Sequence, residues 1–251
     1  MRPRPLKHDL IAEHDDGDVV VRYPRAAHAE AAAAVEVVRA LWPVVEAYLG
    51  ARWGGRVRLE LLAEARVSGA NPAAATLRHS LRGLAERSPA PAGVLSYQLG
   101  QLLWYAAGRE AEYRGPAPRT PDWLLQAALT PLTHAWSERE RWSDHLARHV
   151  QRACRAAPLP EGALERQGDL PGALRALAAS QSLARAQSLE RRVPGWVPAL
   201  LAALADDPQR SAVQALEVVS GCGIDVWRER FRDDLSAWRD ADDEWRSGVV
   251  T

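Results

Sequence analysis

Residues 93–108 of the chain are GVLSYQLGQLLWYAAG, and this stretch decides the fold. Its apolar residues recur at intervals of three and four, which predicts an amphipathic helix. Tyr97 and Gln101 are one turn apart on that helix, so their side chains project within about 40° of each other, on the side opposite the leucines. Gln98 lies beside them. The apolar face consists of Leu95, Leu99, Leu102, Leu103 and Ala106.

The spacing of these polar side chains is one that zinc enzymes use. A helix that presents groups at positions i, i+1 and i+4 over a cleft has the geometry of the H-E-x-x-H motif, in which two histidines bind zinc and the glutamate activates water. A second helix is predicted to begin at residues 121–129, PDWLLQAAL.

Together the two stretches resemble the gluzincin-type metallopeptidases of the zincin superfamily. In that family H-E-L-x-H-x-L is followed by P-x-W-L-x-E-G-x-A, whose glutamate is the third zinc ligand. The resemblance implies that Tyr97 and Gln101 stand at the histidine positions. It likewise places Gln98 at the catalytic glutamate and Gln126 at the third ligand. The shared scaffold residues are Leu99, Gly100, Leu102, Leu103, Pro121, Trp123 and Leu124.

The replacements change the chemistry of the site. Zinc is bound by imidazole nitrogen, thiolate or carboxylate, whereas glutamine is a neutral, weak donor and a phenol titrates near pH 10. The amide of Gln98 cannot take a proton from water. We therefore expect no catalytic residue, no metal and no cofactor at these four positions, and a protein that is not an enzyme.

The rest of the chain predicts an α+β fold that is predominantly helical, and the resemblance implies that it is zincin-like. Residues 18–23 and 56–62 have the pattern of strands, and residues 26–49 between them form an Ala-rich amphipathic helix. Gly108 is a C-terminal stop for the first quoted helix, and Asp169 is a candidate N-cap. The predicted helices after residue 90 are 91–107, 121–136, 138–156, 170–190, 196–205, 209–220 and 224–246.

The domain organisation follows from this division. We expect an N-terminal extension over 1–17 and an α/β part over 18–110 that contains the helix 91–107. A helical part over 111–251 should form one compact unit. Most tryptophans fall in helical segments, so we expect them to anchor the core.

Composition excludes several classes of partner. Lys and Arg total 32, as do Asp and Glu, so the formal net charge is zero and gives no electrostatic reason to expect nucleic acid or an anionic membrane. No apolar run is long enough for a transmembrane helix, and the N-terminus lacks the apolar core of a signal peptide. Cys154 and Cys222 form no metal or redox motif, so reduced thiols and a cytoplasmic location are the default expectation.

A histidine group offers a different interpretation. His145 and His149 are four residues apart in a predicted helix, which is the spacing of a bidentate metal site, and His134 is nearby in sequence. Both also flank the apolar stripe of that helix, so histidines at the edge of the core are the preferred interpretation and a metal site is the alternative.

These patterns lead to three hypotheses about function. The preferred one is a catalytically inactive, peptidase-like protein that binds an unidentified protein or peptide partner. The first alternative is a plain helical scaffold or interaction protein. The second is a metal-dependent hydrolase that uses His134, His145 and His149.

Overall fold

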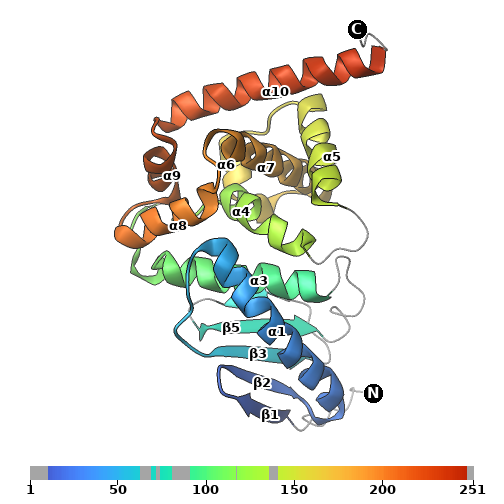
Figure 1. Cartoon of the computed structure of the whole chain (residues 1–251), viewed down its shortest axis with the longest axis vertical. Coiled ribbons are helices and arrows are strands. Elements are labelled where there is room, and N and C mark those ends of the chain that lie inside the picture. The colour runs from blue at the N-terminus through green and yellow to red at the C-terminus, as the bar shows by residue number, and fades with distance from the viewer. Residues whose placement is uncertain are drawn as a thin grey trace, which may run out of the picture.

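The computed structural model of the chain describes residues 11–62, 69–71, 74–80, 91–116, 118–135 and 141–247. In this part the molecule is mostly helical and carries a mixed five-stranded sheet at its N-terminal end (Figure 1), which confirms the α+β, predominantly helical class. No helix within these ranges is both long and apolar enough to cross a bilayer.

The sheet is parallel at its centre and antiparallel at both edges. Its order is β1-β2-β3-β5-β4, with β2, β3 and β5 parallel to one another. Strands β2 and β3 are the two that the sequence predicted, and β1 lies within the expected N-terminal extension. The strands are β1 (Ile11–Asp16), β2 (Val19–Pro24), β3 (Val57–Leu62), β4 (Gly69–Asn71) and β5 (Thr76–Ser80).

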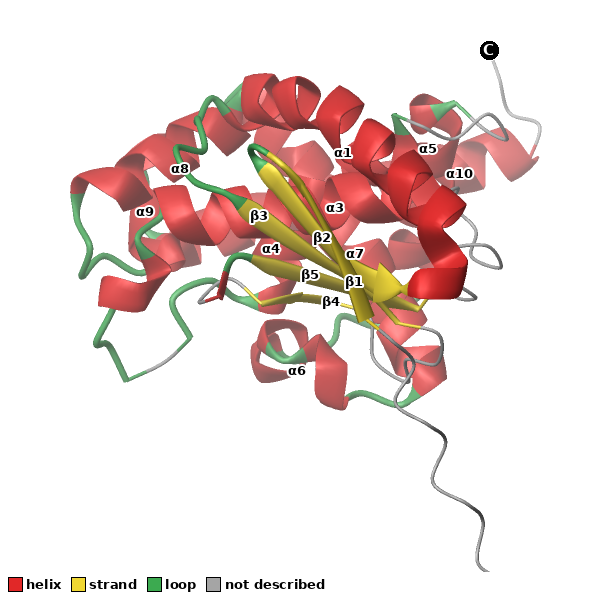
Figure 2. Cartoon of the chain, turned by 90° about the horizontal axis from the view of Figure 1, so that it is seen from below, coloured by secondary structure: helices red, strands yellow, loops and turns green. Residues whose placement is uncertain are grey.

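The two faces of the sheet differ sharply. Alternate residues such as Leu59 and Leu77 are fully buried, because α1 (His28–Leu49) and α3 (Pro91–Ala107) pack against this face (Figure 2). The opposite face carries a row of alternating charges across four strands. Arg22 lies 3.6 Å from Glu13 and 3.7 Å from Glu60, and Arg78 lies 2.7 Å from Glu60, so cross-strand ion pairs support the register.

Helix α3 packs closely against α4 (Asp122–His134). Ser96 Oγ donates a hydrogen bond to the Leu132 carbonyl at 2.9 Å, and the Trp104 indole donates to Thr120 Oγ1 at 3.2 Å. A Cβ at Gly100 would lie 2.9 Å from Leu132 Cδ1, so only glycine allows this approach without a shift. The bounds of α3 match those predicted. Helix α3 ends just before Gly108, as predicted, and the next residue, Arg109, has the left-handed conformation (φ 53°).

Helix α7 (Gly172–Arg192) packs against α4, α5 (Trp142–Arg155), α6 (Glu161–Glu165) and α10 (Ile224–Ser247), and its middle is almost entirely buried. Arg185 on α7 pairs with Glu161 and lies 4.8 Å from the Trp123 ring centroid, so this buried cation is both neutralised and stacked. A single apolar cluster runs from the sheet to the C-terminal helix. The helices are α5 (Trp142–Arg155), α6 (Glu161–Glu165), α7 (Gly172–Arg192), α8 (Trp196–Asp206), α9 (Ala212–Ser220) and α10 (Ile224–Ser247).

Two sequence predictions are corrected in this region. Asp169 is not an N-cap, because it ends a short 3-10 turn (Gln167–Asp169) and Pro171 precedes the first residue of α7. Ala106 is exposed rather than part of the buried face of α3. The expectation that tryptophans anchor the core is confirmed for Trp104, Trp123, Trp196 and Trp227, whereas the side chains of Trp136 and Trp245 lie outside the described residues.

Candidate functional site

The contacts between α3 and α4 define which way each side chain of α3 points. Ser96, Gly100 and Trp104 face α4 or the residues just before it. At 3.6 residues per turn, Tyr97 and Gln101 then project roughly 60° and 100° to one side of this contact line. They flank the helix pair instead of entering the interface between the two helices.

On α4, Gln126 projects toward the same side of the helix pair as Tyr97 and Gln101 of α3. Helix α4 runs antiparallel to α3, since Ser96 meets Leu132 near its end and Trp104 meets Thr120 before its start. Leu129 and Leu132 face α3, which leaves Gln126 roughly 90° to one side. Two antiparallel helices that face each other rotate toward the same flank, so Gln126 and the two α3 residues share it.

Electrostatics support this placement and extend the group. The charge of Asp122 on α4 contributes to raising the pKa values of both Tyr97 and Tyr105, after the larger effect of burial. Tyr105 is one turn beyond Gln101, and Asp122 is one turn before Gln126. We call the resulting surface the polar flank; it consists of Tyr97, Gln101, Tyr105, Asp122 and Gln126. Gln98 projects about 160° from the line of contact with α4 and is buried, so it does not belong to this surface.

The polar flank is made of neutral hydrogen-bonding groups and one carboxylate. Burial raises the pKa of Tyr97 well above its usual range and that of Tyr105 to about 12, so both phenols remain protonated at neutral pH and act as donors. Gln98 is only 5% exposed, and its Oε1 makes no hydrogen bond with any described residue. This oxygen is enclosed by the protein, so a ligand on the polar flank would not reach it.

These residues do not fit zinc. Three of the four positions carry neutral amides, and the fourth carries a phenol whose raised pKa opposes the phenolate that a metal needs. Within the described ranges no group of three or more His, Cys, Asp or Glu side chains has the arrangement of a metal site. A zinc-dependent step therefore has no ligands here.

The three histidines do come together, as a cluster of tilted rings: the planes of His134 and His145 meet at 38°, and those of His145 and His149 at 50°. The ring centroids of His134 and His145 are 3.6 Å apart, and those of His145 and His149 are 4.4 Å apart. Imidazoles that bind one tetrahedral zinc at about 2 Å hold their centroids about 5 Å apart, with nitrogens converging on the metal. The observed rings are too close for that geometry.

His149 is held as a neutral ring in this histidine cluster. Its Nδ1 lies 2.9 Å from Ser180 Oγ, and its pKa is lowered to about 4 by burial and then by the neighbouring His145. The arrangement agrees with histidines at the edge of the core, which was one of the two readings of the sequence, and it gives the hydrolase hypothesis no support.

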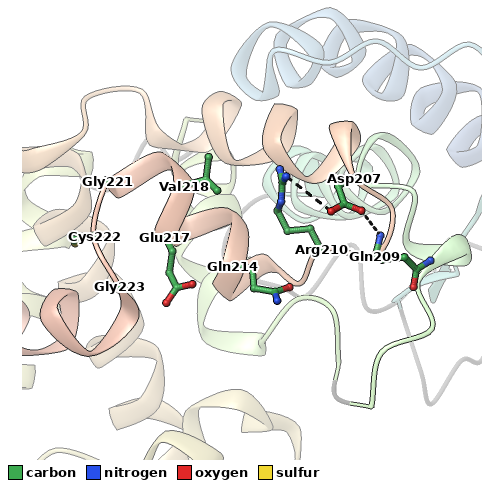
Figure 3. Close-up of a pocket in the computed structure, with 9 residues that line it drawn as sticks. All are labelled: Asp207, Gln209, Arg210, Gln214, Glu217, Val218, Gly221, Cys222 and Gly223. Atoms are coloured by element: carbon green, nitrogen blue, oxygen red, sulfur yellow. Dashed lines mark hydrogen bonds and ion pairs between the residues drawn. The ribbon is translucent and has the colours of Figure 1, made fainter.

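A polar pocket of about 630 Å³ lies elsewhere, beside α9 (Figure 3). No sequence pattern predicted this pocket. Its side chains largely satisfy one another and the nearby backbone. Arg210 donates to the Ala203 carbonyl at 2.7 Å, Asp207 accepts from the Gln209 amide at 2.9 Å, and Glu217 accepts from the Ile224 amide at 2.8 Å. These bonds connect α8, α9 and α10, so we assign the pocket a structural role.

Comparisons with known proteins identify no relative: neither protein-family models nor characterised proteins match the chain.

Proposed function

We propose that this protein is a catalytically inactive relative of zinc metallopeptidases that binds a protein or peptide segment on the polar flank of α3 and α4. The observation that carries the proposal is the shared flank itself. Tyr97, Gln101 and Gln126 come from two helices, and packing turns all three to the same side.

The scaffold that the family resemblance relies on is buried as such a site would require. Leu99, Leu102 and Leu103 of α3 are at most 2% exposed, and so are Trp123 and Leu124 of α4. These residues belong to the core of the molecule, while the positions of the ligands and the catalytic base carry other side chains. Retained packing beside replaced chemistry favours an inactive relative over a chance pair of helices.

The chemistry of the polar flank suits a peptide backbone. Two protonated phenols donate hydrogen bonds, and glutamine amides both donate and accept, so they can pair with the N–H and C=O groups of an extended segment. The carboxylate of Asp122, whose Oδ2 accepts only a long hydrogen bond of 3.4 Å from the Gly168 amide, adds a preference for a basic side chain.

Selection from a random-peptide display library on the purified protein tests this proposal. We expect recovered peptides to lose about tenfold in affinity when Tyr97→Phe and Gln101→Ala are combined, because two hydrogen bonds are removed. Ser236→Ala, at an exposed position on α10, is the matched control and should change nothing. Peptides that bind the double variant as well as the parent, or a selection that recovers no binder, would contradict the proposed function.

The scaffold alternative makes a different prediction. A helical scaffold without peptidase ancestry would bind through a surface unrelated to α3 and α4. The selected peptides would then bind the parent and the double variant with the same affinity.

A further inference from the structure

A second cavity, of about 420 Å³, lies where α1, α4, α5, α7 and α8 meet. It is on the side of α4 away from α3, because Ala127 and Pro131 line it while Leu129 and Leu132 face α3. Its volume is in the range that accommodates a small organic ligand. The cavity is therefore separate from the polar flank.

Aromatic rings form much of the wall. Tyr48, Trp142 and Trp196 come from three different helices and line the same space, and aliphatic and proline side chains fill most of the remainder. Trp196 is held rigidly, with only 2% of its surface exposed. The Tyr48 hydroxyl is fixed by donating to the Ala128 carbonyl at 2.7 Å. Aromatic faces carry negative electrostatic potential and attract cations.

One charged side chain, Glu190, lines the cavity. Its Oε1 accepts a hydrogen bond from the Gly195 amide at 3.1 Å, where glycine allows the positive φ of 72°. Glu190 forms no ion pair with any described residue. Its charge also contributes to the raised pKa of Tyr48, after burial, so the field of the carboxylate extends across the cavity wall.

We propose that this cavity binds a monovalent organic cation with an apolar body, such as a quaternary or alkylated ammonium compound. Three aromatic residues and one carboxylate that pairs with no cation among the described residues are complementary to such a group. A carboxylic acid ligand would meet Glu190 with like charge. A hydrated metal ion would find a single carboxylate among apolar walls, which is too few ligands.

Calorimetric titration of the full chain, with tryptophan fluorescence as a second readout, tests the proposal. The probes are benzyltrimethylammonium, choline, and 3,3-dimethyl-1-butanol, which is the neutral carbon isostere of choline. We expect saturable binding of both cations below about 10 mM, and binding of the neutral isostere at least about fivefold weaker.

Substitutions at Glu190 and Trp142 locate the site. Glu190→Gln keeps an acceptor for the Gly195 amide and removes the charge, so cation affinity should fall at least about fivefold while that of the neutral isostere stays unchanged. Glu229→Gln, an exposed carboxylate on α10, is the matched control. Trp142→Phe retains an aromatic wall and should weaken binding less than Trp142→Leu, and circular dichroism confirms that each variant is folded.

The outcomes are distinct. No saturable binding of either cation, equal binding of choline and its neutral isostere, or unchanged binding by Glu190→Gln would each overturn the proposal. Variants of the polar flank should leave cation binding intact, so failure of the peptide experiment and failure of this one are separate results.

Discussion

Helices α3 and α5 each carry a pair of polar side chains at positions i and i+4. Each pair meets only one of the two requirements of a metal site, which are donor chemistry and convergence on one point. On α3, Tyr97 and Gln101 share a flank with Gln126 of a neighbouring helix, but none of the three is a zinc donor. On α5, His145 and His149 are ideal donors, yet their rings pack against each other at a tilt, and the His145 ring also contacts that of His134. Spacing along a helix is therefore insufficient, because donor chemistry and convergence must coincide.

The surroundings explain why the two helices differ. Helix α3 lies between the sheet, α1 and α4, and its position is fixed on several sides. The exposed side of α5 carries Arg148 and Arg152, and both contribute to lowering the pKa of His149. A cation bound among those arginines would be opposed by their charge.

The largest expected effect concerns the close approach of α3 to α4. Gly100→Leu would place a side chain where even a Cβ meets Leu132 and Leu129 at 2.9 and 3.0 Å, so the free energy of unfolding should fall by about 2–3 kcal/mol. Chemical denaturation measures this change. Ala147→Leu on the exposed side of α5 is the matched control and should change stability by no more than about 0.5 kcal/mol. Equal effects of the two substitutions would mean that the α3–α4 contact is not tight.

An intermediate effect concerns the histidine cluster and the dependence of protein stability on pH. The pKa of His149 is about 4 in the folded protein and about 6.5 in the unfolded chain, so the unfolded state binds the extra proton between those values. Stability is therefore fully present above about pH 6.5 and is lost as the pH falls toward about 4, by about 1–2 kcal/mol after allowance for solvent screening.

His149→Gln, which can still bond to Ser180, is the variant that isolates this effect. Its unfolding free energy should vary less between pH 7 and pH 4.5 than that of the parent, by about 1–2 kcal/mol. If the unfolding free energies of the two proteins varied with pH in parallel, His149 would titrate normally and the histidine cluster would not hold it neutral.

The smallest expected effect is on metal binding by α5. If the histidine rings pack together instead of chelating a metal, the His134→Gln variant should bind zinc as weakly as the parent does, with affinities equal to within about twofold. Calorimetric titration with zinc chloride makes the comparison. A loss of tenfold or more would place His134 in a metal site and favour the hydrolase hypothesis.

Sequence periodicity predicted helices such as α1 well, because their buried residues recur at intervals of three and four. Strand β1 was missed because its sequence, IAEHDD, is acidic and lies at an edge, where pairing with β2 and the Arg22–Glu13 ion pair replace apolar burial. Strand β4, GAN, is too short for a pattern. Helix α6 spans five residues and was missed for the same reason.

For the site, the sequence indicated the four positions that a family motif would occupy and nothing beside them. Tyr105 and Asp122 join the polar flank because of how α3 packs on α4, and neither matches a motif. Glu190 and Tyr48 meet across a cavity although they are far apart in the chain, so only the tertiary fold reveals that they act together. Local patterns encode helix faces, whereas contacts between distant helices decide which faces meet.

The most direct test of the central claim is to restore the zinc site. The variant combines Tyr97→His, Gln98→Glu, Gln101→His and Gln126→Glu. We predict that it binds about one equivalent of zinc with micromolar or tighter affinity, because two imidazoles and a carboxylate would then share the flank. The matched control is Leu146→Glu, which writes H-E-x-x-H on α5 between His145 and His149 without a converging third ligand. We predict no stoichiometric zinc for that control or for the parent. A folded fourfold variant that binds no more zinc than the α5 control would contradict descent from a metallopeptidase site.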